Sequence, residues 1–211
     1  MLDIFEDIQT LLALGGPIVA ILLVASVFGL ALTLRKFQQF SKVSEPVLKR
    51  LYLAVEQWHS GEQKSALEII DGSSLAIAHD LRFVLEQHSR VDSDYLYDEI
   101  LRRSSEFLRE YARNLRILEL IYTLAPVLGL LGTVLGMIDA FRGLAGSAGS
   151  AAESAALAGG IWEALLTTAV GLSIAICFAV LHTFLESKLE VLTNQVNDVF
   201  SRALILPVYS S

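Results

Sequence analysis

The chain has 211 residues, of which 54% are hydrophobic, and its mean hydropathy is +0.55. This composition is too apolar for an ordinary soluble domain. The net charge of −7, with no basic patch interleaved with aromatic residues, argues against a nucleic acid as partner. Cys177 is the single cysteine, which excludes an intrachain disulfide bond and a cysteine-based metal site.

Three stretches contain no Asp, Glu, Lys or Arg: residues 11–34, 120–138 and 164–181. About 20 predominantly apolar residues suffice to cross a bilayer as a helix. We therefore predict an all-α integral membrane protein with three transmembrane helices. The first stretch is predicted to be a retained span rather than a cleaved signal peptide, because acidic rather than basic residues precede it.

The chain begins with a short acidic segment, residues 1–10, whose apolar residues Leu2, Ile4, Phe5 and Ile8 predict an interfacial helix outside the membrane. Transmembrane helix 1 is assigned to residues 11–36. Its regular part is expected to start near Pro17, because a Gly-Gly pair precedes this proline and prolines are favoured in the first turn of a helix.

Residues 37–93 are predicted to form a cytoplasmic helical region. A helix entry is expected at Pro46, and apolar residues recur after it at helical spacing. Gly61 and Gly72 mark expected breaks between short helices. The absence of alternating β-branched runs argues against a sheet.

An amphipathic pattern starts at residue 94 and meets no Gly or Pro before the second span, so residues 94–141 are predicted to form one long helix. The low-complexity segment 142–160 is predicted to be a short loop outside the membrane. Transmembrane helix 3 is assigned to residues 161–182, and it is expected to continue into a C-terminal helix and tail at 183–211. Two spans that extend far into the cytosol as amphipathic rods indicate assembly with further copies of the chain.

The orientation follows from the positions of the 16 Lys and Arg residues. Most lie between the first and second spans, none precedes the first, and only Arg142 lies between the second and third. The positive-inside rule then places the N-terminus outside and the C-terminus in the cytoplasm.

Small residues follow one face of the second and third spans at intervals of three or four residues. In the second span they are Ala125, Gly129, Gly132, Gly136, Ala140 and Gly143, and in the third they are Ala164, Thr168, Gly171, Ala175 and Ala179. In hydrocarbon, small residues let helix backbones approach closely. These stripes predict that both spans pack against other helices.

Each of these spans also carries hydroxyl groups, at Thr133 and at Thr168 with Thr167 beside it. A threonine in a membrane helix commonly donates to a carbonyl of its own helix. The positions of Thr133 and Thr168 on or beside the stripes favour a second interpretation, in which they line a path for ions. Hydroxyls can pass a proton or coordinate a cation, but they do not store charge near neutral pH.

Charge storage requires a titratable group, and the candidates Glu119, Asp139, Glu163 and His182 lie near span ends. Glu163 opens the third span, where a carboxylate in the first turn is favoured by the helix dipole. Glu119 and Asp139 also have simple explanations as residues at the membrane borders, and His182 as an interfacial residue.

Moving a bare charge through hydrocarbon is costly. If ions cross here, this chain supplies hydroxyls at the membrane centre and no carboxylate, so an acidic residue of another chain is expected to complete the path. No phosphate-binding loop, HExxH motif or Ser-His-Asp set occurs, so we expect neither an enzyme nor a cofactor or metal.

The sequence APVLGLLGTVLGMIDAF at residues 125–141 resembles the APxxGLxGTVxGI pattern of the MotA/TolQ/ExbB proton-channel family. The sequence GGIWEALLTTAVGLSIAI at residues 159–176 resembles that family's GIxEALxxTAxGLxxAIP pattern. Both are closest to the ExbB and TolQ branch. Two motifs of this length, in order and each in a membrane span, form a specific signal.

The resemblance implies that Thr133 and Thr168 line the ion pathway and that Glu163 is the family's glutamate of the third span. It also implies a homopentamer in the bacterial inner membrane, with the N-terminus and the 142–160 loop periplasmic. The pentamer would surround the single spans of an ExbD- or TolR-like dimer, whose aspartate is the carboxylate lacking here. A TonB- or TolA-like protein would carry the work to the outer membrane.

Cys177 departs from the pattern, because the family usually has a proline there, and a cysteine does not impose the kink that a proline causes. The chain also lacks the additional span of MotA-type flagellar stators. Three readings remain open: an ExbB-type channel subunit, a TolQ-type subunit for envelope integrity and division, and a non-conducting scaffold whose threonines only hold helices together. The choice between protons and sodium ions stays open as well.

Overall fold

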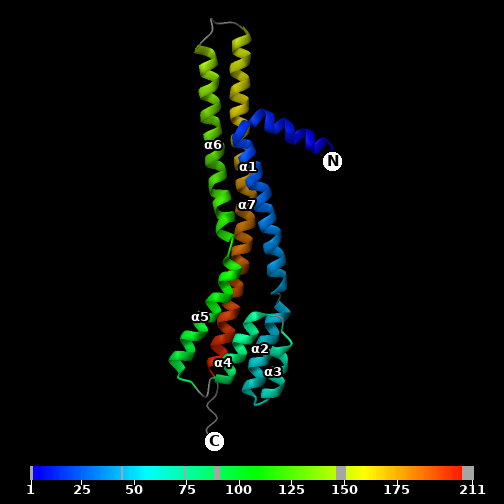
Figure 1. Ribbon diagram of the computed structural model, residues 1–211, viewed down its shortest axis with the longest axis vertical. Helices are drawn as coiled ribbons and strands as arrows, with labels where there is room; N and C mark the ends of the chain where they lie inside the picture. Colours follow the sequence, from blue (N-terminus) through cyan, green and yellow to red (C-terminus); the bar gives the residue numbers. More distant parts are fainter. Residues whose placement is uncertain (1, 44, 74, 88–90, 146–150, 206–211) are drawn as a thin grey trace. The chain divides into compact units, whose positions relative to one another are not determined.

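The computed structural model describes residues 2–43, 45–73, 75–87, 91–145 and 151–205; side chains are described from residue 16 onward, except at 45–47, 144–145, 151–154 and 156. Within these ranges the chain is helical and contains no strand (Figure 1). The helices are α1 (Leu2–Lys42), α2 (Glu45–His59), α3 (Gln63–Asp71), α4 (Ala76–Gln87), α5 (Ser93–Ala112), α6 (Leu115–Ala145) and α7 (Ala151–Leu204).

Three helical segments are long and apolar enough to cross a membrane: Gly16–Lys42 in α1, Leu115–Gly143 in α6 and Leu157–Leu204 in α7. Their exposed faces are rich in large aliphatic and aromatic side chains, which water would not favour but lipid would. The prediction of an all-α protein with three transmembrane helices is confirmed.

The chain divides into two compact units. The first, unit 1, comprises Met1–Leu34 and Asn114–Phe184 and holds most of the apolar length of α1, α6 and α7. The second, unit 2, comprises Arg35–Arg113 and Leu185–Ser211 and contains α2 to α5.

In unit 1, α1 carries a kink at Gly16, whose φ of 58° and ψ of −161° lie in a region that only glycine adopts readily. Pro17 follows it, as expected for the start of the regular span. The predicted apolar face of residues 2–8 lies outside the described side chains. Further along, a Cβ on Gly29 would lie 2.6 Å from the ring of Phe178, so α1 approaches α7 closely at this glycine.

Unit 2 has an apolar core built from α2 to α5, with residues of α7 completing it. Phe107 and Tyr111 pack their rings 5.0 Å apart, and the Tyr52 hydroxyl donates to the carbonyl of Gln195 at 3.2 Å. The buried residues of this core recur at helical spacing, as the sequence predicted for α2; they include Leu48, Leu51, Ile70, Leu81, Leu85, Leu96, Ile100, Val196, Val199 and Phe200. Full burial of one such aliphatic side chain contributes about 1.5–3 kcal/mol.

The surface of α5 carries a charge cluster in which Glu99 accepts from Arg102 at 2.8 Å and from Arg103 at 2.6 Å. These hydrogen bonds lower the pKa of Glu99 to about 2. Because the folded pKa lies below the unfolded value, Glu99 stabilises the fold above about pH 4.5 and loses that contribution as the pH falls towards 2. We expect the melting temperatures of the wild type and Glu99→Gln to differ at pH 6 and to converge only as the pH approaches 2. A difference that stays constant over this range would contradict the assignment.

The prediction of one uninterrupted helix over residues 94–141 is wrong. The helix ends at Ala112, Arg113 has a ψ of 136°, and Asn114 has a positive φ of 71° before α6 begins at Leu115. Asparagine tolerates this left-handed conformation better than most residues, so Asn114 can end a helix. The prediction of one helix had relied on the absence of glycine and proline from this stretch.

The predicted loop over residues 142–160 is largely helical. Helix α6 extends to Ala145 and α7 begins at Ala151, ten residues before the predicted start of the third span; residues 146–150 lie outside the described part. The segment reads as low complexity because of its Gly and Ser content, but its many alanines have the highest helix propensity.

Candidate functional site

The candidate site lies where α6 and α7 pack against each other in unit 1, and it is built on glycines that allow backbone contact. A Cβ on Gly171 would lie 2.5 Å from the carbonyl oxygen of Ala125, and one on Gly129 would lie 3.0 Å from the Cα of Thr168. Real Cβ atoms essentially never come as close to a backbone as at Gly171, so only glycine fits there, and the contact at Gly129 is tighter than most real Cβ contacts. The two helices therefore meet backbone to backbone at this level.

The same packing continues along both helices. A Cβ on Gly132 would clash with the side chain of Thr167, and one on Gly136 would lie 2.9 Å from the Cβ of Ala164. Ala125, Ala164 and Ala175 are buried as well. The small-residue stripes of the two spans thus face each other within a single chain.

Two hydroxyls of α7 point at one carbonyl of α6. Thr168 donates to the carbonyl of Gly129 at 2.9 Å. The Thr167 hydroxyl lies 3.2 Å from the same oxygen and 2.7 Å from the carbonyl of Ala164 in its own helix. Because a hydroxyl has one proton, Thr167 donates to one of these carbonyls at a time. The Thr168 bond crosses between helices.

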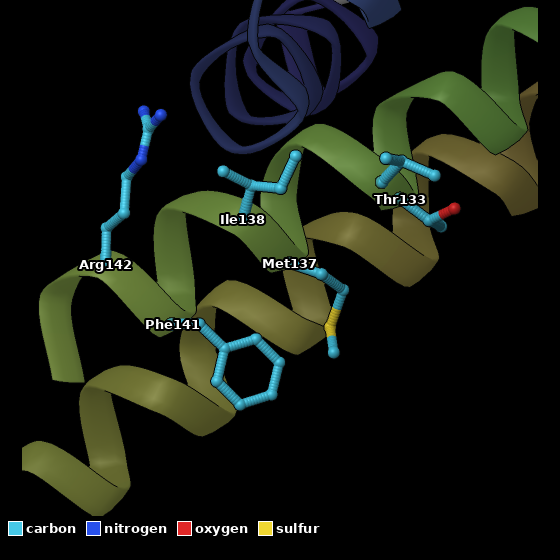
Figure 2. A pocket seen from close by; sticks show the side chains of 6 residues that line it. Thr133, Met137, Ile138, Phe141 and Arg142 are labelled. Carbon is cyan, nitrogen blue, oxygen red and sulfur yellow. The ribbon is translucent and has the colours of Figure 1, made fainter. Parts of the chain in front are cut away.

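Thr133 is arranged differently. Its hydroxyl donates at 2.6 Å to the carbonyl of Leu130 in its own helix, and its side chain is half-buried. It lines an open hollow of about 610 Å³ together with five further residues of α6: Val134, Met137, Ile138, Phe141 and Arg142. Figure 2 shows Ile138 and Arg142 projecting from one side of α6 and Met137 and Phe141 from the other. Thr133 and Arg142 are the polar members of this otherwise apolar wall.

Glu163 does not lie in the first turn of its helix, because α7 begins twelve residues earlier at Ala151. The helix-dipole explanation for this carboxylate is therefore wrong. Instead, its Oε1 lies 3.9 Å from the point where a Cβ on Gly16 would be, so the carboxylate faces the kink of α1. Glycine offers no side chain to cap the N–H groups of the helical turn that follows it.

The other titratable candidates lie apart from the threonines. Asp139 is exposed and pairs with Arg142 at 3.7 Å, and Glu119 is exposed on α6. His182 is buried and packs against Tyr122, with ring centroids 5.3 Å apart. In the described part of the chain, no three His, Cys, Asp or Glu side chains lie together in a way that could hold a metal ion.

Sequence reasoning missed two positions. Gly29 was missed although Ala25 and Thr33 lie four residues before and after it, a spacing of small residues that indicates helix packing. Lys36 gave no signal beyond its positive charge. Lys36 is nevertheless buried, with 3% of its surface exposed, and donates to backbone carbonyls of α5.

Together these features define a multi-pass helical membrane protein whose hydroxyls and small residues are concentrated on one pair of tightly packed spans. The chain belongs to the MotA/TolQ/ExbB proton channel family, whose family model matches residues 74–198. The resemblance seen in the sequence is thereby confirmed, and this is a family of channel and transport-associated proteins.

Individual relatives carry ExbB names. The chain is 28% identical to an ExbB homolog of Methanothermobacter thermautotrophicus over 90% of its own length and 67% of that protein. It is 53% identical to an ExbB-like protein of Synechocystis over 35% of its length and 30% of that protein. It is 36% identical to the biopolymer transport protein ExbB of Helicobacter pylori over 54% of its length and 77% of that protein. The cyanobacterial match thus spans less than a third of its relative.

Proposed function

We propose that this chain is the channel-forming subunit of an energy-transducing complex in the bacterial inner membrane. It uses the proton-motive force to drive active transport across the outer membrane. The observation that carries this proposal is the pairing of α6 and α7 through the two family motifs, with the hydroxyl-bearing Thr133 lining an open hollow on α6. In a wall whose polar members are Thr133 and Arg142, the threonine hydroxyl can pass a proton once a second group completes the path.

The ion pathway in this proposal contains Thr133, Thr168 and Glu163. The Thr133 hydroxyl is more easily released than that of Thr168, because its bond to the Leu130 carbonyl stays within one helix. It can be exchanged for a bond to a passing ion or water. Thr168 is held against Gly129 and positions the wall. Glu163 would supply negative charge near the outer end of the span.

The missing acid would come from a partner. The proposed complex is a homopentamer around the single spans of an ExbD-like dimer, each with an aspartate, and a TonB-like protein receives the work. The termini would be oriented with the N-terminus periplasmic and the C-terminus cytoplasmic, which follows from the distribution of Lys and Arg. A TolQ-type role in envelope integrity and division uses the same architecture with TolR- and TolA-like partners.

One observation favours a different class of function. The bonds from Thr167 and Thr168 to the Gly129 carbonyl are those expected of a scaffold whose threonines only join helices. A scaffold needs neither an acidic partner nor an open path. The channel and the scaffold therefore differ in the composition of the complex, because only the channel requires an acidic partner.

The proposal is tested by purifying the tagged chain from its native membrane and determining the mass of the intact complex. The channel reading predicts five copies of this chain with two copies of a small protein that has one span and an aspartate in it. Recovery of oligomers of this chain alone, across several mild detergents, would favour the scaffold. The identity of a TonB- or TolA-like protein encoded nearby would separate the two channel roles.

A further inference from the structure

Lys36 lies near the end of the apolar part of α1, and its ammonium group donates three hydrogen bonds. It donates to the Oε1 of Gln39 at 2.8 Å, to the carbonyl of Glu110 at 3.2 Å and to the carbonyl of Tyr111 at 2.7 Å. An ammonium group has three protons, and these bonds use all of them. With 3% of its surface exposed, this lysine is a buried cation whose acceptors include two backbone oxygens.

The two carbonyls belong to the last turn of α5, which ends at Ala112. Carbonyls in the last turn of a helix have no intrahelical donor, and the partial negative charge of the helix C-terminus collects there. A cation from another helix satisfies both requirements. Gln39 adds a weaker bond from its Nε2 to the Glu110 carbonyl at 3.4 Å, and Phe40 packs on Tyr111 with ring centroids 5.5 Å apart.

This cap lies next to the break at Arg113 and Asn114, where α5 gives way to α6. A break without tertiary support would let the last turn of α5 fray. Here the turn is held by three side chains from the end of α1: Lys36, Gln39 and Phe40.

We infer that Lys36 is a positioning residue that clamps the end of α5 to α1 and so makes the Asn114 break a defined joint. Because of this clamp, the end of α1 and the last turn of α5 behave as one body, and the backbone freedom of the joint is confined to Arg113 and Asn114. The inference goes beyond the proposed function and does not rest on ion flow.

The test is amide hydrogen exchange on the full chain in lipid nanodiscs, comparing wild type with Lys36→Met, which keeps an apolar stem and removes the cation. We expect the amides of Ala112 and Arg113 to exchange about tenfold faster, as for loss of a charge-assisted bond to a carbonyl. The core amides of α4 at Leu81 and Val84 should keep the wild-type rate. Lys42→Met is the matched control, because Lys42 is exposed in the last turn of the same helix, and it should leave all four amides unchanged.

If Lys36→Met does not yield folded protein, Gln39→Leu gives the same test at smaller amplitude, with exchange at Ala112 and Arg113 about threefold faster. Lys36→Arg retains the cation and should restore protection. Wild-type exchange at Ala112 and Arg113 in the folded variant would overturn the clamp, and so would an equal acceleration in α4. Failure of the protein to conduct ions would not bear on this result.

Discussion

Replacing Gly171 with alanine should prevent α6 and α7 from packing and abolish recovery of the assembled protein. The added methyl group would lie 2.5 Å from the Ala125 carbonyl oxygen and 3.1 Å from the Cα of Gly129. Both neighbours are backbone atoms, so no side-chain rotation relieves the contact and one helix has to move. Overpacking of this kind typically costs about 1–3 kcal/mol, and the loss of the Thr168 bond would add to it.

The matched control is Gly159→Ala, which makes the same change in the same helix where a Cβ meets nothing within 4 Å. This control should assemble as well as the wild type, since alanine is the better helix former. The measurement is the yield and thermal stability of the oligomer after extraction in a mild detergent. If Gly171→Ala and Gly159→Ala behave alike, the close approach of α6 and α7 is not required.

Thr133→Val should leave assembly intact and lower proton conduction by on the order of 10- to 100-fold, as for loss of one hydrogen bond to a charged species in the path. Valine fills nearly the same space, and the bond that it removes lies within one turn of α6. The protein therefore loses a hydroxyl and little else. Conduction is measured as proton flux into liposomes that contain the complex with its partner.

Thr183→Val is the control for this experiment. Its hydroxyl also donates within its own helix, to the carbonyl of Ala179 at 2.9 Å, but it does not line the hollow. It should conduct like the wild type. Thr168→Val is less informative, because it removes the bond that joins α7 to Gly129 and so disturbs packing and path together. Normal flux through Thr133→Val would remove this threonine from the pathway and favour the scaffold.

Features governed by periodicity and side-chain size could be predicted from the sequence. The three spans follow from length and hydropathy alone. The glycine and alanine stripes follow from a spacing of three or four residues, and in the structure they meet along α6 and α7. The sequence left open whether the facing stripe belonged to the same chain or to another copy.

Features governed by tertiary contact could not be predicted. Asn114 breaks a helix with a residue that helices commonly tolerate, and Lys36 bonds to the last turn before this break across 75 positions of the chain. The helix-dipole explanation of Glu163 failed for a related reason. It depended on where α7 begins, and alanines extend that helix well beyond the apolar segment.

The proposed path through the membrane combines hydroxyls of this chain with an acidic residue of a partner. Proton flux into liposomes tests it most directly, with three samples: this chain alone, the chain with its single-span partner, and the chain with a partner whose intramembrane aspartate is replaced by asparagine. We expect flux in the second sample only. Flux through this chain alone, or undiminished flux with the asparagine partner, would contradict it.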